Sequence, residues 1–168
     1  MMQQIEPPDA HYLNAAVGWL ELGNLAEARA ELDRISPANQ THPDVLEVRW
    51  VLCAEEKDWP AALAAARAML ERAPKRATGW LHQAYALRRA PGGGVEQAWA
   101  ALKPAFERFP KEPIIAFNLS CYACQMQRLP EARQWFRRAL AIGDKEKLKQ
   151  MALADADLEP LWDEIRKI

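Results

Sequence analysis

An alanine recurs at nearly constant spacing through most of the chain, and this recurrence constrains the fold more than any other feature. Ala28, Ala62, Ala98 and Ala132 are separated by 34, 36 and 34 positions. A fixed period of this length is typical of proteins built from stacked supersecondary units, each of which buries its apolar face against its neighbours. The sequence therefore predicts a repeat protein with four similar units.

Each unit is predicted to contain two helices. Pro60 and Pro130 lie two residues before the recurring alanine, in the first helical turn, where the missing N–H is not needed. In the second unit, one helix is predicted over 43–56 and another over 59–73, with Asp58 as the N-cap between them. No segment alternates apolar and polar residues as a strand would, so the predicted fold is all-α.

The residues around the alanines resemble the tetratricopeptide repeat family, whose motif of about 34 residues places small and aromatic residues at fixed helix positions. The third unit carries Trp80, Ala84 and Pro110 at such positions, and the fourth carries Ala116 and Phe136. The resemblance covers about residues 9–142. It implies an all-α solenoid of about four antiparallel helix pairs with a C-terminal capping helix.

The boundaries follow from this phase. A single domain over 1–168 is expected to hold repeats at about 9–42, 43–76, 77–112 and 113–142, with a cap over 143–168. The tail carries an apolar stripe that would cover the end of the stack, where a last repeat otherwise exposes its hydrophobic face. The triple glycine over 92–94 lacks the residues of a phosphate-binding loop and is interpreted as an extended turn.

The second unit departs most from the family pattern. Trp50 occupies a position where a small residue is usual, whereas Ala66 on the facing helix replaces the usual aromatic residue. A large and a small side chain have therefore changed places, and a core tolerates such a volume-conserving exchange. Arg49 replaces a usual leucine and has no role that the sequence alone explains.

Composition limits the classes of function. The formal net charge is -1 and the charges are interspersed, which disfavours broad nucleic-acid or membrane-surface binding. No apolar stretch approaches the ~18–20 residues of a membrane-spanning helix, and residues 1–9 do not resemble a signal peptide. Three cysteines do not form a disulfide framework, so a cytoplasmic location is expected.

The family resemblance implies a non-enzymatic adaptor or scaffold without a cofactor, which binds a protein or peptide in a concave groove lined by the first helix of each repeat. Fourteen residues carry over to the partner-binding groove: Leu13, Asn14, Val17, Glu21, Glu47, Val51, Glu55, His82, Tyr85, Arg88, Arg89, Phe117, Asn118 and Gln125. Six further positions of the same helices carry over with them: Asp44, Val48, Thr78, Leu81, Ile114 and Cys121.

The character of these positions predicts the ligand. Asn14 and Asn118 resemble part of the clamp with which some family members hold a C-terminal carboxylate, but the lysines of that clamp are missing. The groove is acidic in the first two repeats and basic and aromatic in the third. An extended ligand of mixed charge, with an apolar anchor near Tyr85 and Phe117, would fit it.

Two other functions stay open at this point. Cys121 and Cys124 form a C-x-x-C pair on one helix face, which could serve thiol redox chemistry or metal binding. However, the pair lies in mid-helix, no second such pair exists, and His11, His42 and His82 are scattered. RNA binding is the other alternative, because pentatricopeptide repeats are similar helical pairs, but their inner faces are basic.

Overall fold

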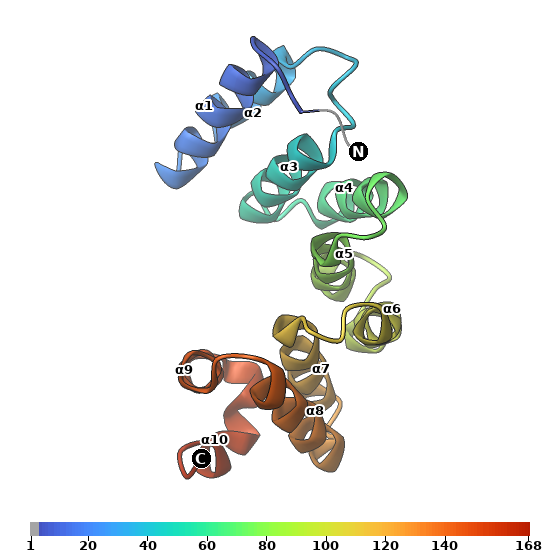
Figure 1. Cartoon of the computed structure of the whole chain (residues 1–168), viewed down its shortest axis with the longest axis vertical. Helices are drawn as coiled ribbons and strands as arrows, with labels where there is room; N and C mark the ends of the chain where they lie inside the picture. The colour runs from blue at the N-terminus through green and yellow to red at the C-terminus, as the bar shows by residue number, and fades with distance from the viewer. Residues whose placement is uncertain (1–3) are drawn as a thin grey trace. The chain divides into compact units, whose positions relative to one another are not determined.

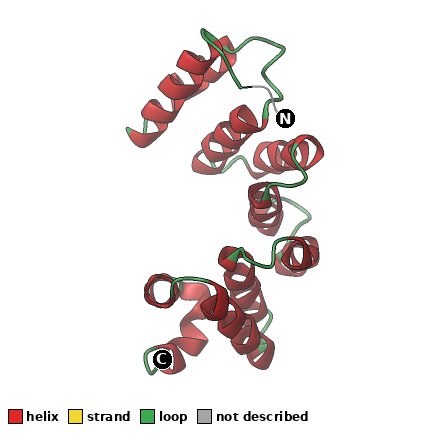
Figure 2. Cartoon of the chain, in the orientation of Figure 1, coloured by secondary structure: helices red, strands yellow, loops and turns green. Residues whose placement is uncertain are grey.

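A computed structural model describes residues 4–168, and every regular element in this range is a helix (Figure 2). The all-α prediction is confirmed. The helices predicted over 43–56 and 59–73 are present as α3 (Pro43–Glu55) and α4 (Trp59–Arg72), each one residue shorter than expected. The chain forms two compact units, one ending at Pro91 and one beginning at Gly92. The single domain expected from the sequence stays a prediction.

The first unit contains five helices, and neighbours in sequence pack together (Figure 1). Their bounds are α1 (Asp9–Glu21), α2 (Leu25–Arg34), α3 (Pro43–Glu55), α4 (Trp59–Arg72) and α5 (Ala77–Arg89). The first helices of the two pairs, α1 and α3, also touch each other directly. This contact places one face of α1 beside one face of α3.

The second unit contains the second helix of the third pair, the fourth helix pair and the tail. Its elements are α6 (Val95–Arg108), α7 (Pro113–Gln125), α8 (Leu129–Ile142), α9 (Lys145–Ala154), the 3-10 helix η1 (Ala156–Leu161) and α10 (Trp162–Ile165). α6 packs on α7, and α7 packs on α8. Trp99 of α6 and Trp135 of α8 meet edge to face, with ring centroids 5.9 Å apart.

The turn inside three of the helix pairs is the same structure. Gly23, Lys57 and Gln127 adopt left-handed backbone conformations, with φ of 72°, 59° and 59°. In each case the next residue donates its backbone N–H to the carbonyl five residues earlier, at 2.9, 2.8 and 2.9 Å. This is the Schellman arrangement, which ends a helix by satisfying its last carbonyls. The recurrence explains why the helices change direction at the same repeat position.

The residue after the left-handed turn also starts the next helix. Asn24 accepts a hydrogen bond from the backbone N–H of Glu27 at 3.2 Å, and Asp58 accepts one from Ala61 at 3.1 Å. Such caps satisfy backbone donors that have no partner inside the helix. One short polar residue therefore closes one helix and opens the next, which keeps the connection short.

The core of the second helix pair contains the exchange predicted from the sequence. Trp50 of α3 packs in one buried cluster with Ala62 and Ala66 of α4, where the missing aromatic volume would otherwise leave a cavity. Arg49 has a structural role that the sequence did not predict. Its guanidinium donates hydrogen bonds to the Leu32 carbonyl at 3.2 Å and to the Gln40 side chain, so it satisfies the end of α2.

The tail folds back onto the helix pair that precedes it. Leu158, Leu161 and Ile165 are almost fully buried, and η1 lies against α7 while α9 contacts α8. The indole N–H of Trp162 donates to the Ala152 carbonyl at 2.8 Å, which joins α10 to α9. The tail is therefore a cap of three short helices.

Candidate functional site

The first unit has an open groove that is lined only by α1 and α3. It encloses about 570 Å³. The lining residues of α1 are Leu13, Asn14, Val17, Leu20 and Glu21, and those of α3 are Asp44, Glu47, Val48, Val51 and Glu55. Both sets recur at intervals of three and four residues, so each occupies one face of its helix.

The groove faces away from the core because the same helices bury their other face. Ala16 of α1 and Val45 and Leu52 of α3 are fully or almost fully buried against α2. Val17, by contrast, keeps 38% of its surface exposed. The five apolar lining residues, here called the floor, are therefore only partly covered by the protein itself.

Four carboxylates surround this floor, and one of them is neutralised within the chain. Asp44 forms an ion pair with Arg76 at 2.5 Å. Desolvation raises the pKa of the half-buried Glu47 carboxyl above its ordinary value, although the nearby Arg76 offsets part of this effect. Within residues 4–168, Glu21 and Glu55 have no ion-pair partner. The groove lining therefore combines the apolar floor with these four acidic side chains, here called the rim.

Seven of the fourteen predicted groove residues line this one groove: Leu13, Asn14, Val17, Glu21, Glu47, Val51 and Glu55. Asp44 and Val48, which carried over with them, line it too. Leu20 is the lining residue that the sequence analysis missed. It lies three residues after Val17 and seven after Leu13, so helical periodicity alone could have identified it.

The predicted residues of α5 lie outside the groove lining. His82 stacks on Trp50 with ring centroids 3.8 Å apart and an angle of 4° between the planes. Burial lowers the pKa of His82 from 6.5 to about 4, so the ring is neutral at physiological pH. Tyr85 remains 39% exposed, and the Arg89 guanidinium lies 3.6 Å from its ring centroid. Arg88 is on the same helix. His82 therefore serves core packing, whereas Tyr85 and Arg89 form a small exposed pair.

The predicted residues of α7 lie under or beside the tail. Phe117 is only 4% exposed and packs near Phe136, so the apolar anchor expected there is not accessible. The Gln125 amide donates to the Asp157 carbonyl at 3.5 Å, and Asn118 is half-buried. The expectation of an open groove at Phe117 has to be corrected, because this side chain is buried and its ring packs near Phe136 of α8.

Comparison with known proteins accounts for this architecture. Residues 92–147, from just before α6 into α9, match the family model of the tetratricopeptide repeat. A thermophilic tetratricopeptide repeat protein of Thermus thermophilus, TTC0263, has a similar fold, with a TM-score of 0.73 over 94% of this chain and 82% of that chain at 19% identity. Residues 92–147 thus match a tetratricopeptide repeat, and the chain shares the fold of solved tetratricopeptide repeat proteins.

Other solved structures of the same fold are equally distant in sequence. The MamA RS-1 ArsTM double mutant has a TM-score of 0.68 at 15% identity, covering 90% of this chain and 80% of that one. MamA MSR-1 has a TM-score of 0.63 at 14% identity, covering 96% and 97%. At such identities the likeness concerns the fold alone. Comparison with curated proteins finds no match.

The two cysteines of α7 are packed into the core of the fourth helix pair. Cys121 and Cys124 are 3% and 4% exposed. Burial raises the pKa of the Cys121 thiol far above its ordinary value and that of Cys124 to about 11, and nearby carboxylates add to both effects. The Cys121 thiol donates to Asp155 at 3.5 Å. A reactive thiol needs the opposite shift, because the thiolate is the nucleophile and metal ligand. In the described part of the chain, no three His, Cys, Asp or Glu residues gather as a metal site.

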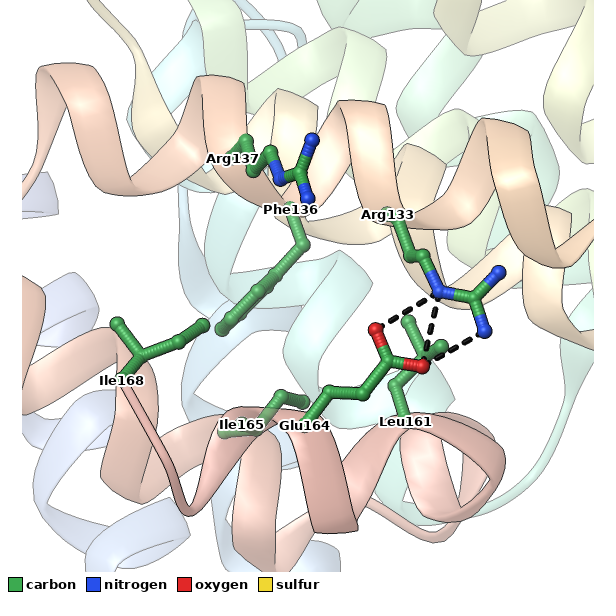
Figure 3. Close-up of a pocket in the computed structure, with 7 residues that line it drawn as sticks. All are labelled: Arg133, Phe136, Arg137, Leu161, Glu164, Ile165 and Ile168. Carbon is green, nitrogen blue, oxygen red and sulfur yellow. Dashed lines mark hydrogen bonds and ion pairs between the residues drawn. The ribbon is translucent and has the colours of Figure 1, made fainter.

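A smaller cavity of about 210 Å³ lies between α8 and the tail (Figure 3). Arg133 binds the Glu164 carboxylate with two nitrogens, at 2.6 to 2.9 Å, and Phe136 and Ile165 lie beside this pair. These hydrogen bonds lower the pKa of Glu164. None of the predicted site residues lines this cavity. The cavity lies where α10 packs against α8 of the last helix pair.

Among residues 4–168, no helix combines the length and the apolar character that crossing a membrane requires.

Proposed function

We propose that this tetratricopeptide repeat protein is a non-enzymatic binding module, an adaptor or scaffold, that holds a segment of a partner protein in the groove between α1 and α3. The observation that carries the proposal is the partly exposed apolar floor of this groove. The groove has a volume of about 570 Å³, which is enough for several side chains of a ligand. Proteins of this family are generally scaffolds rather than enzymes, which supports the same conclusion.

The size and openness of the groove favour a peptide segment over a small metabolite. A small-molecule site encloses most of its ligand, with a few polar groups converging on it. Here the apolar residues lie along two helices and the polar residues follow the rim. An extended or helical segment laid along α1 and α3 would bury this strip, which is how helical grooves commonly bind peptides. The free, buried cysteines are consistent with a reducing compartment, and the proposal places the module in the cytoplasm.

Site-specific photo-crosslinking tests the proposal in an extract of the source cells. A photoreactive phenylalanine derivative replaces Val17 or Val51 in the groove, and Ala64, exposed on α4, serves as the matched control position. The same partner protein should be crosslinked from both groove positions and not from position 64. The additional substitution Leu13→Ser should abolish the crosslink at position 51. Equal crosslinking from position 64, or none from the groove, would refute the proposal.

A further inference from the structure

We infer that the groove between α1 and α3 selects a cationic amphipathic segment, with apolar side chains on the floor and Lys or Arg side chains at the rim. This inference rests on the proposed function and specifies the chemistry of its ligand. The sequence alone predicted a ligand of mixed charge, because it assigned the basic residues of α5 to the same groove. In the structure the ten lining residues all come from α1 and α3, and none of them is basic.

The floor sets the apolar part of the ligand. Leu13, Val17 and Leu20 of α1 face Val48 and Val51 of α3 across the groove. Burying one aliphatic side chain is worth roughly 1.5–3 kcal/mol relative to leaving it exposed. Two or three ligand side chains of the size of leucine would therefore supply much of the binding free energy, but they would not discriminate between charged ligands.

The rim sets the charge of the ligand. Arg76 approaches the rim, where it is already bound to Asp44. Glu47 is half-buried and loses hydration without gaining an ion-pair partner, while Glu21 and Glu55 lie at the same rim. A ligand cation placed here would form charge-assisted hydrogen bonds, which are about twice as strong as neutral ones. An anionic ligand would meet Glu21 and Glu55, which have no ion-pair partner among residues 4–168, and Glu47, whose charge Arg76 offsets only in part. Repulsion therefore opposes its binding.

The same charges separate this ligand class from nucleic acids and anionic lipid surfaces. Both present phosphate groups, which bind to clusters of Lys and Arg. The groove presents carboxylates instead, although the whole chain is close to neutral at a net charge of -1. The acidic character is therefore local to the apolar strip, which is the arrangement that a basic amphipathic peptide complements.

A random dodecapeptide library displayed on phage and selected on the full chain provides the probe. Counter-selection uses the double variant Val17→Ser/Val51→Ser, which removes apolar floor without changing the charge of the groove. Peptides that bind the wild type and not this variant report on the groove. We expect these groove-dependent peptides to carry several Lys or Arg residues together with two or three large apolar residues, and to bind more weakly as salt rises.

Charge-neutralising variants then test the rim directly with one selected peptide. Glu47→Gln/Glu55→Gln should weaken its binding on the order of tenfold at low salt, which corresponds to about 1.4 kcal/mol. The control Glu27→Gln/Glu71→Gln makes the same charge change at exposed residues of α2 and α4, and should alter binding less than about twofold.

The outcomes separate the inference from the proposed function. Groove-dependent peptides that are neutral or acidic would overturn the cationic ligand and leave the binding groove intact. Equal weakening by the groove and control variants would also overturn it, since the attraction would then come from overall charge. Recovery of no peptide that depends on Val17 and Val51 would contradict both the ligand chemistry and the groove.

Discussion

At the level of single residues, His82 shows how burial decides between a packing role and a binding role. It is one of the predicted groove residues, yet its ring lies flat against Trp50, and its Nε2 is buried without a hydrogen-bond partner. Burial of Nε2 penalises the charged imidazole, so the neutral form is favoured. The exchange of large and small residues places Trp50 on α3, and this tryptophan provides the surface on which His82 stacks.

The depressed pKa of His82 predicts a specific dependence of stability on pH. Because the folded-state pKa is about 4 and the ordinary value is 6.5, the stabilising effect is complete above pH 6.5 and is lost as the pH falls towards 4. The loss from this one group should reach about 3 kcal/mol in the free energy of unfolding. Denaturant unfolding at pH 7 and pH 4.5 should show a smaller difference for His82→Gln than for the wild type.

Two further measurements make this prediction decisive. The control His11→Gln changes an exposed histidine of α1 and should retain the pH dependence of the wild type. Nuclear magnetic resonance of the His82 ring should give a titration midpoint near 4. A midpoint above 6 would show that the ring is hydrated and that the stacked arrangement does not hold in solution.

Two residues show which contacts could be predicted from the sequence and which could not. The exchange of Trp50 and Ala66 was readable because a repeat provides an internal standard: each position can be compared with its equivalents. Arg49 was not readable, since its partners, the Leu32 carbonyl and the Gln40 side chain, lie in the preceding pair and the loop after it. Contacts within a repeat follow the period, whereas contacts between a helix and a loop depend on how the loop folds.

At the level of helices and turns, the turns explain why the helix pairs could be predicted so closely. Three pairs place a left-handed residue at the same repeat position, and in two of them the next residue, Asn24 or Asp58, caps the following helix with its side chain. Gly23 provides the left-handed conformation without steric cost, but Lys57 and Gln127 provide it with a Cβ atom present. This conformation costs an L residue roughly 1–2 kcal/mol. Two of the three turns therefore contain a local conflict that glycine would relieve.

The conflict predicts a stabilising substitution. Gln127→Gly should raise the free energy of unfolding by about 0.5–1 kcal/mol, because the relief of strain exceeds the added entropy of the unfolded chain. For a chain of this size the midpoint of thermal unfolding should rise by about 1–3 °C. Gln125→Gly is the matched control two residues earlier, in α7, where glycine should lower stability by about 1 kcal/mol. Destabilisation by both variants would contradict the left-handed turn.

The tail shows the limit of prediction for whole elements. Its apolar residues predicted a cap, and Leu158, Leu161 and Ile165 are indeed buried. An apolar stripe in the sequence does not, however, indicate which helices it will pack against. The 3-10 helix lies on α7, where Asp155 accepts from the thiol of Cys121, and this contact hides part of the face that was expected to bind a partner. The error at Phe117 has a different cause, since its ring packs near Phe136 within the same helix pair.

For the molecule as a whole, the candidate site could be predicted only where the family pattern and the local packing agree. All seven predicted positions on α1 and α3 line one groove, because the same helical periodicity that buries Ala16 and Leu52 turns the opposite face outwards. The acidic rim could be read from the sequence as well. The absence of α5 residues from the groove lining could not be read from the sequence, since it depends on how α5 packs against α3 and α4.

The charge distribution shows why global properties are a poor guide to this function. The net charge of -1 and the interspersed charges indicate an ordinary protein surface. The carboxylates matter because they surround apolar residues that the chain leaves partly exposed. A binding surface of this kind is defined by the coincidence of the two features, and neither is visible in composition.

Methyl-detected nuclear magnetic resonance during titration with a groove-selected peptide would locate the binding site on the folded chain. The methyl resonances of Leu13, Val17, Val48 and Val51 should shift as peptide is added, because these side chains form the floor of the groove. The methyl groups of Leu102 and Leu158, buried in the second unit, serve as internal references and should stay unchanged. Shifts confined to other methyl groups, with those four unaffected at saturation, would contradict a binding site between α1 and α3.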